Sequence, residues 1–141
     1  MENVENKGLL KANNEFDRKE LFRIAREMTK KAYAPFSGFH VGAALLGEDG
    51  KVYTGVNVEN SSLGATICAE RTAAVKAVSE GQTRFVAIAV ASTEEEAFPC
   101  GICRQFLYEF APELIVISGV DEDHLKEYKL NEMLIEGFRL K

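Results

Sequence analysis

The sequence predicts an α/β fold, a three-layer α/β/α sandwich around a central mixed sheet of about five strands. The expected segments follow the order α-β-β-α-β-α-β-(β)-α, which packs helices on both faces of one sheet. Residues 84–91, RFVAIAVA, form a continuous apolar run that is typical of a central buried strand. The 141 residues match the size of one domain with a substantial core rather than two domains.

Each element follows from a local signal. Residues 1–15 are polar and are expected to form a flexible N-terminal tail before a single domain over residues 16–141. Asp17 and Glu20 form a capping box, and apolar residues recur after them at helical spacing. An EDG turn between two strand-like segments predicts a hairpin. In order, the expected elements are a helix that stops before Pro35, strands at 39–46 and 51–58, a helix at 67–80, a strand at 84–91, a helix at 99–110, a strand at 114–117, an acidic loop or turn at 121–126 and a short helix at 131–136.

Composition and charge argue against several classes of function. The net charge is −5, and the Lys and Arg residues are scattered without a basic stripe, which disfavours tight binding to nucleic acid. No apolar run approaches the roughly 20 residues that span a bilayer. The N-terminal residues are polar and lack the apolar core of a signal peptide, so we expect a cytoplasmic protein without a membrane partner.

A carboxylate interrupts the apolar stripe of the alanine-rich helix ICAERTAAVKAV. At about 100° per residue, the helix face centred on Glu70 also carries Ala73, Ala74 and Ala77. Taken alone, Glu70 could be a partly exposed acid in a first helical turn, where acids are favoured. If the stripe is buried, an unpaired carboxylate there is costly. Glu70 therefore needs either compensation or a chemical role.

The three cysteines indicate a metal site. An odd number of cysteines in a reducing compartment speaks against a disulfide framework. Taken alone, the C-x-x-C pair could be a redox pair, a zinc half-site or two core thiols. Cys68, Cys100 and Cys103 all fall at predicted helix starts, where the helix dipole stabilises thiolates. Three converging thiolates suit zinc, and Arg71 would compensate part of their negative charge.

The absence of a fourth ligand at metal-binding spacing distinguishes two kinds of zinc site. Structural zinc sites are closed by four ligands, whereas catalytic sites keep one position for water. The two histidines, His40 and His124, have no ligand spacing to a cysteine. The pattern therefore favours zinc with bound water beside Glu70.

Several motifs carry a resemblance to a known family. C-A-E at 68–70 followed by P-C-G-I-C at 99–103 resembles the zinc deaminase signature, in which a glutamate that is not a ligand acts as general acid and base. Over about residues 20–140 the chain is similar to the small cytidine deaminases of nucleoside salvage. The segments that carry this similarity are FSGFHVGAALL, GVNVEN, TICAERTAA, AVSEG, PCGICRQ and GFRL.

The resemblance implies hydrolytic deamination of cytidine and deoxycytidine to uridine and deoxyuridine, with release of ammonia. The three cysteines would hold one Zn²⁺ per subunit, and Glu70 would carry protons from water to the pyrimidine ring nitrogen and the departing amine. The implied substrate contacts are Phe39 beside the base, Asn57 and Glu59 at the sugar hydroxyls, and the backbone around Ala69 at the amino edge of the base.

The resemblance also implies a homotetramer with composite active sites. In the family an aromatic residue often stands where this chain has Leu63, and it helps to line a neighbouring subunit's site. Phe138 corresponds to a family phenylalanine that reaches into an adjacent subunit. The sequence MLIE at 133–136 replaces the family's usual L-L-P.

Two other kinds of function stay open. One is deamination of a related compound such as blasticidin S, guanine or free cytosine, although N-V-E-N and Phe39 favour a nucleoside, and most relatives acting on free bases have histidine where this chain has Cys68. Polynucleotide deaminases are disfavoured by the acidic charge and small size. The other is a non-catalytic zinc-binding or redox module, which would need a fourth ligand or an exposed low-pKa cysteine pair.

Overall fold

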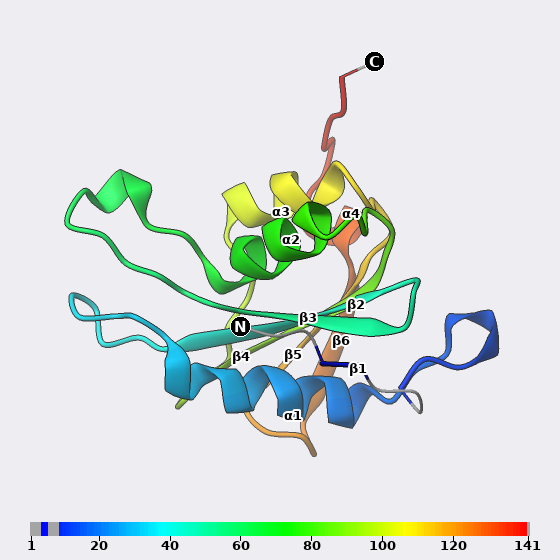
Figure 1. Ribbon diagram of the computed structural model, residues 1–141, viewed down its shortest axis with the longest axis horizontal. Coiled ribbons are helices and arrows are strands. Elements are labelled where there is room, and N and C mark those ends of the chain that lie inside the picture. Colours follow the sequence, from blue (N-terminus) through cyan, green and yellow to red (C-terminus); the bar gives the residue numbers. More distant parts are fainter. Residues whose placement is uncertain (1–3, 6–8, 141) are drawn as a thin grey trace.

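A six-stranded sheet lies between helix α1 on one face and helices α2, α3 and α4 on the other (Figure 1). This computed structural model describes residues 4–5 and 9–140. The helices are α1 (Arg18–Met28), α2 (Ala69–Ser79), α3 (Gly101–Tyr108) and α4 (Leu130–Met133), with 3-10 turns η1 (Ala12–Asn14), η2 (Thr29–Lys31) and η3 (Leu63–Ala65). The strands are β1 (Val4–Glu5), β2 (Val41–Gly47), β3 (Lys51–Val56), β4 (Phe85–Ser92), β5 (Ile115–Gly119) and β6 (Leu125–Lys129). The predicted α/β/α sandwich is confirmed.

The strand order is β1-β3-β2-β4-β5-β6. β4 pairs in parallel with β5, and every other pair in the sheet is antiparallel, so the sheet is mixed as expected. All residues of β4 are buried, in agreement with its apolar sequence. Because β4 lies inside the sheet with helices on both faces, its side chains contribute to both cores.

Residues 4–5 and 9–15 of the predicted loose tail contact the domain, and the other tail residues lie outside the described part of the chain. Val4–Glu5 pairs with β3 as a short edge strand, which brings the sheet to six strands. Leu9 is 1% exposed and belongs to the core beneath α1, and Leu10 bridges to Phe16. Burial of Leu9, the bridge between Leu10 and Phe16 and the pairing of Val4–Glu5 with β3 together account for the difference from the prediction.

Helix α2 packs unusually close to the sheet. Ala69, Ala73, Ala74 and Ala77 are fully buried against it. β3 contributes Gly55, where an added Cβ would lie 2.3 Å from the backbone oxygen of Ala69. Small residues on both surfaces therefore bring the first turn of α2 directly onto the sheet.

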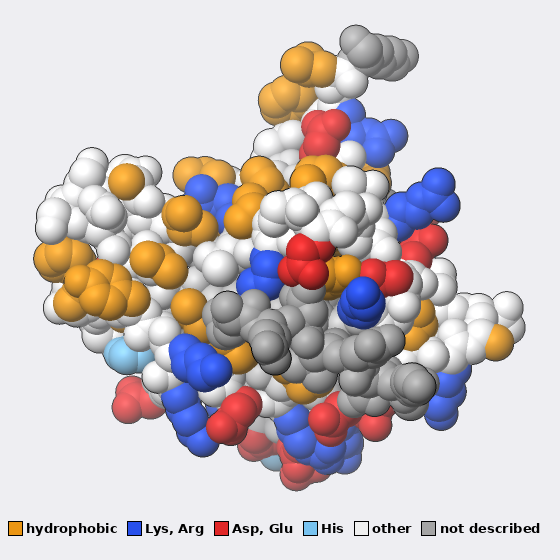
Figure 2. Space-filling model, in the orientation of Figure 1, with side chains coloured by type: hydrophobic (Ala, Val, Ile, Leu, Met, Phe, Trp, Pro, Cys, Tyr) orange, Lys and Arg blue, Asp and Glu red, His pale blue; other side chains and the backbone are white. Residues whose placement is uncertain are grey.

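Two loops extend together beyond one end of the sheet (Figure 1). They are residues 32–40, between η2 and β2, and residues 57–68, between β3 and α2. Backbone bonds join them, because Tyr33 donates to Asn57 and Glu59 donates to Tyr33, both at 2.9 Å. Hydrophobic side chains gather on this projection, at the left of the view, and on the C-terminal segment at its top (Figure 2). No helix in residues 4–5 and 9–140 combines the length and apolar character that crossing a membrane requires.

Candidate active site

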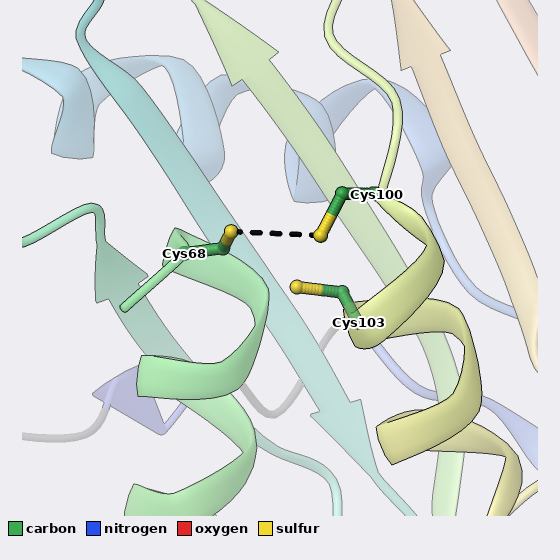
Figure 3. Close-up of side chains that lie close together, drawn as sticks. All are labelled: Cys68, Cys100 and Cys103. Carbon is green, nitrogen blue, oxygen red and sulfur yellow. Dashed lines mark hydrogen bonds between the residues drawn. The ribbon is translucent and has the colours of Figure 1, made fainter. Parts of the chain in front are cut away.

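The three cysteines converge at the N-termini of α2 and α3 (Figure 3). Cys68 and Cys100 are the N-cap residues of these helices, and Cys103 lies in the first turn of α3. The three sulfur atoms lie within 4.8 Å of one another, with 3.7 Å between those of Cys68 and Cys100. The sequence prediction that these residues meet is confirmed.

The sulfur geometry fits one zinc ion. Four ligands around zinc at about 2.3 Å stand about 3.8 Å apart in a regular tetrahedron, close to the 3.7 Å measured here. Among the described residues, the metal-binding cluster contains the three cysteines without a histidine or carboxylate as fourth member. The donor set therefore matches a zinc site with one open coordination position.

The positive charge of Arg71 stabilises the thiolate form of the cysteines. Arg71 reaches from the first turn of α2, with Nη2 3.6 Å from the Cys68 sulfur and 3.4 Å from the Thr66 carbonyl oxygen. Hydrogen bonding from Cys103, together with Arg71 and Cys100, lowers the pKa of the Cys68 thiol to about 5. The Cys103 thiol holds the shared proton and is buried, so its own pKa is raised. The lowered pKa favours the thiolate form of Cys68, which is the form that binds a metal.

Glu70 is buried beside this cluster, with 3% of its surface exposed. Burial, together with the nearby Cys68 thiolate, raises the pKa of its carboxyl group to about 7, although a backbone hydrogen bond and Arg71 oppose the shift. A carboxyl group with a pKa near neutrality exchanges protons readily in both directions. The structure thus confirms that the alanine stripe buries a carboxylate.

A cavity of about 310 Å³ joins Glu70 to the metal site. This volume is at the lower end of the range typical of small-molecule sites. The cavity is lined by Phe39, Val41, Asn57, Thr66, Cys68, Ala69, Glu70, Glu96, Ala97, Phe98 and Cys100.

One wall of the cavity was missed by sequence reasoning. Glu96, Ala97 and Phe98 form it, and they lie between the expected strand at 84–91 and the expected helix at 99–110, where the sequence predicted no site residue. Their position just before Pro99 and Cys100 in the chain was the available signal, since a residue next to a metal ligand cannot lie far from the metal site.

Comparison with known proteins supports this site. The family model of the cytidine and deoxycytidylate deaminase zinc-binding region matches residues 16–118. This chain belongs to that family. A cytidine deaminase of Halalkalibacterium halodurans is 46% identical over 124 residues, which are 86% of this chain and 94% of that protein.

Solved structures of this deaminase family share the fold. Cytidine deaminase from Burkholderia pseudomallei superposes with a TM-score of 0.82 at 40% identity, covering 87% of this chain and 100% of that one. Cytidine deaminase from Mycobacterium tuberculosis gives a TM-score of 0.79 at 37% identity, covering 89% and 100%.

The residues predicted to bind substrate in this deaminase lie in two different settings. Phe39, Asn57 and Ala69 line the cavity, whereas Glu59 is not among the described residues that line it. Asn57 also binds the backbone at the start of β2 and in the loop before it, because Oδ1 accepts from Val41 at 2.9 Å and Nδ2 donates to the Phe39 carbonyl at 2.7 Å. Asn57 thus shapes the cavity wall as well as facing the cavity.

The two residues predicted to contact a neighbouring subunit stand apart from the cavity of their own chain. Leu63 is 75% exposed on η3, and Phe138 is 63% exposed on the C-terminal segment. Gln105 holds that segment by donating to the Phe138 carbonyl at 2.8 Å. Their contact with a second subunit stays a prediction.

Proposed function

We propose that this protein is a zinc-dependent cytidine deaminase, converting cytidine and deoxycytidine with water into uridine or deoxyuridine and ammonia. The observation that carries the proposal is the buried Glu70 carboxyl group, which shares one cavity with two of three converging thiols. The family match and relatives with this activity in their names support the same conclusion.

In this proposal Cys68, Cys100 and Cys103 hold one zinc ion, which when bound lowers the pKa of water toward neutrality. Glu70 takes a proton from the water that adds to the ring carbon bearing the amino group. Its carboxyl group then delivers that proton to the adjacent ring nitrogen. Glu70 next takes the remaining proton from the added hydroxyl and passes it to the amine, and ammonia leaves as the C–N bond breaks and the carbonyl of the product forms. A pKa of about 7 suits a group that must accept and donate protons in one cycle.

The remaining walls of the cavity would orient the nucleoside. We assign Phe39 to the face of the base and the backbone at Ala69 to its amino edge, because both line the cavity. Asn57 and Glu59 are assigned to the sugar hydroxyls. Arg71 would offset the negative charge of the thiolates, as supported by its 3.6 Å contact with Cys68.

We also propose that the protein is a homotetramer whose sites are completed by neighbouring subunits through Leu63 and Phe138. Exposed apolar side chains on the projecting loops and the C-terminal segment support association. A cytoplasmic location is proposed as well, since three free cysteines suit a reducing compartment.

A substrate panel with metal analysis tests the function. Purified protein would be analysed for zinc and assayed with cytidine, deoxycytidine, cytosine, adenosine and blasticidin S, following ultraviolet absorbance and released ammonia. We expect one zinc per chain and rapid turnover of the two cytidine nucleosides alone. Turnover of blasticidin S without cytidine would identify a different deaminase. Zinc-loaded protein that releases no ammonia from any compound would indicate a non-catalytic module.

A further inference from the structure

Phe39 stands at the end of an exposed turn that has few anchors. Residues 35–37 form the turn, and Gly38 follows with a φ of 69°, a left-handed conformation that favours glycine. Phe36, Ser37 and Phe39 are all exposed. Since Phe39 lines the cavity from this position, its placement depends on the contacts that hold the turn.

Glu59 supplies three of those contacts, in addition to the backbone bond that Gly38 donates to the Ala34 carbonyl at 3.0 Å. Its Oε1 accepts from the backbone nitrogens of Phe36 at 2.9 Å and Ser37 at 3.1 Å. Its Oε2 accepts from the Ser37 hydroxyl. These bonds lower the pKa of the Glu59 carboxyl group, the Ser37 hydroxyl making the largest contribution. Three of about four acceptor positions on the carboxylate are thus used inside the turn.

The Ser37 hydroxyl extends this arrangement to Phe39. While its proton is donated to Glu59, its oxygen accepts from the Phe39 backbone nitrogen at 3.0 Å. Ser37 therefore links the carboxylate to the residue at the cavity wall. Asn57 binds the carbonyl of the same residue, so both backbone polar groups of Phe39 are held by side chains.

We propose that Ser37 is a positioning residue, through which Glu59 fixes Phe39 against the base of the substrate. The inference rests on the proposed deaminase function and extends it, because it gives Glu59 a role besides sugar binding. Removing the hydroxyl leaves Phe39 N–H without this partner and frees one acceptor position on Glu59. The wall that Phe39 forms is then less ordered before substrate binds.

The kinetic consequence follows from what Phe39 would contact. A residue packed on the base interacts with substrate and transition state alike, so its loss raises KM more than it lowers kcat. We expect Ser37→Ala to raise KM for cytidine about tenfold, or ~1.4 kcal/mol, with kcat within about twofold. The melting temperature should not change, because Ser37 is exposed outside both cores.

The experiment compares Ser37→Ala, Ser37→Thr, Glu59→Ala and the double variant Ser37→Ala/Glu59→Ala in the zinc-loaded protein. Ser37→Thr keeps the hydroxyl and should retain the wild-type KM. In the Glu59→Ala background, Ser37→Ala should raise KM by a smaller factor than in the wild type, since no carboxylate then holds the hydroxyl that binds the Phe39 N–H. Ser61→Ala is the matched control, because Ser61 is exposed on the neighbouring loop and its hydroxyl makes no hydrogen bond to the described residues.

Three results would overturn the proposal. They are a wild-type KM in Ser37→Ala, a change in kcat alone in that variant, or an equal rise in KM on replacing Ser37 whether or not Glu59 is present. Wild-type protein that fails to deaminate cytidine would instead refute the proposed function, so the two failures are distinguishable.

Discussion

Replacing Gly55 with alanine is expected to shift α2 and thereby misplace the groups at its first turn. The added Cβ would lie 2.3 Å from the backbone oxygen of Ala69 and 2.5 Å from the backbone nitrogen of Ala73. Real Cβ atoms essentially never approach closer than 3.0 Å, so the Ala69 oxygen must move by at least 0.7 Å (3.0 − 2.3). Both obstructing atoms belong to the backbone, so the helix itself has to move.

The expected losses of stability and of catalytic activity both follow from that shift of α2. Overpacking a core costs about 1–3 kcal/mol, which lowers the melting temperature of a domain of this size by roughly 3–12 °C. Glu70 follows Ala69 directly and moves with it. Because misplacement of reacting groups by about 1 Å can cost on the order of 100-fold in rate, we expect kcat/KM to fall roughly 10- to 100-fold.

Gly42→Ala is the matched control. Its Cβ would lie 2.0 Å from the Ala25 backbone oxygen, an equally severe clash with α1 on the opposite face of the sheet. Thermal unfolding and cytidine deamination would be measured for both variants at a temperature where each remains folded. We expect similar losses of stability, with activity lost mainly in Gly55→Ala. Wild-type stability in Gly55→Ala, or equal losses of activity in both variants, would refute this reasoning.

Three further predictions concern the site and the turn at the end of the β2–β3 hairpin. Glu70→Ala should keep its zinc and its fold while losing nearly all turnover, because the group that carries protons is gone. Metal analysis combined with a deamination assay checks this, and substantial residual activity would contradict it. Cys100→Ala should lose stoichiometric zinc and melt at a lower temperature, and full zinc retention would rule out Cys100 as a ligand. Asp49→Asn should be less stable than wild type at pH 7. Burial raises the pKa of Asp49, but hydrogen bonds from Tyr53 and the Lys51 backbone outweigh it and lower the pKa in the folded state. The ionised Asp49 therefore stabilises the wild type above about pH 4, and this stabilisation is lost as the pH falls through the pKa of Asp49 in the folded state. A difference in unfolding free energy between wild type and Asp49→Asn that is the same at about pH 7 and about pH 3 would disprove this prediction.

Local sequence patterns predicted the position of a residue correctly where that position depends mainly on the helix that contains it. The spacing of Ala73, Ala74 and Ala77 around Glu70 predicted a buried stripe, and the structure buries it. Likewise, the positions of Cys68 and Cys100 at predicted helix starts indicated that their sulfurs could meet, and they lie 3.7 Å apart.

Features that depend on contacts between distant segments were not predictable in the same way. β6, with the sequence LKEYK, carries exposed charges because it is an edge strand, and such a sequence resembles a loop. The link from Glu59 through Ser37 to Phe39 begins with a bond between residues 22 positions apart, and no periodic pattern marks it. The wall formed by Glu96–Phe98 depends on how α3 docks beside α2.

The division of the metal ligands between two helices has a consequence for how the chain is held together. Cys68 and Cys100 are 32 positions apart in the sequence, so an ion bound to both acts as a cross-link between α2 and α3. In the chain-entropy description of cross-links, a loop of that length restricts the unfolded ensemble by roughly 3–4 kcal/mol. During synthesis this tie can form only after Cys103 has left the ribosome, by which point β2, β3 and β4 have already been made. Loss of the ion would therefore remove a restraint between α2 and α3 as well as the centre of the proposed chemistry.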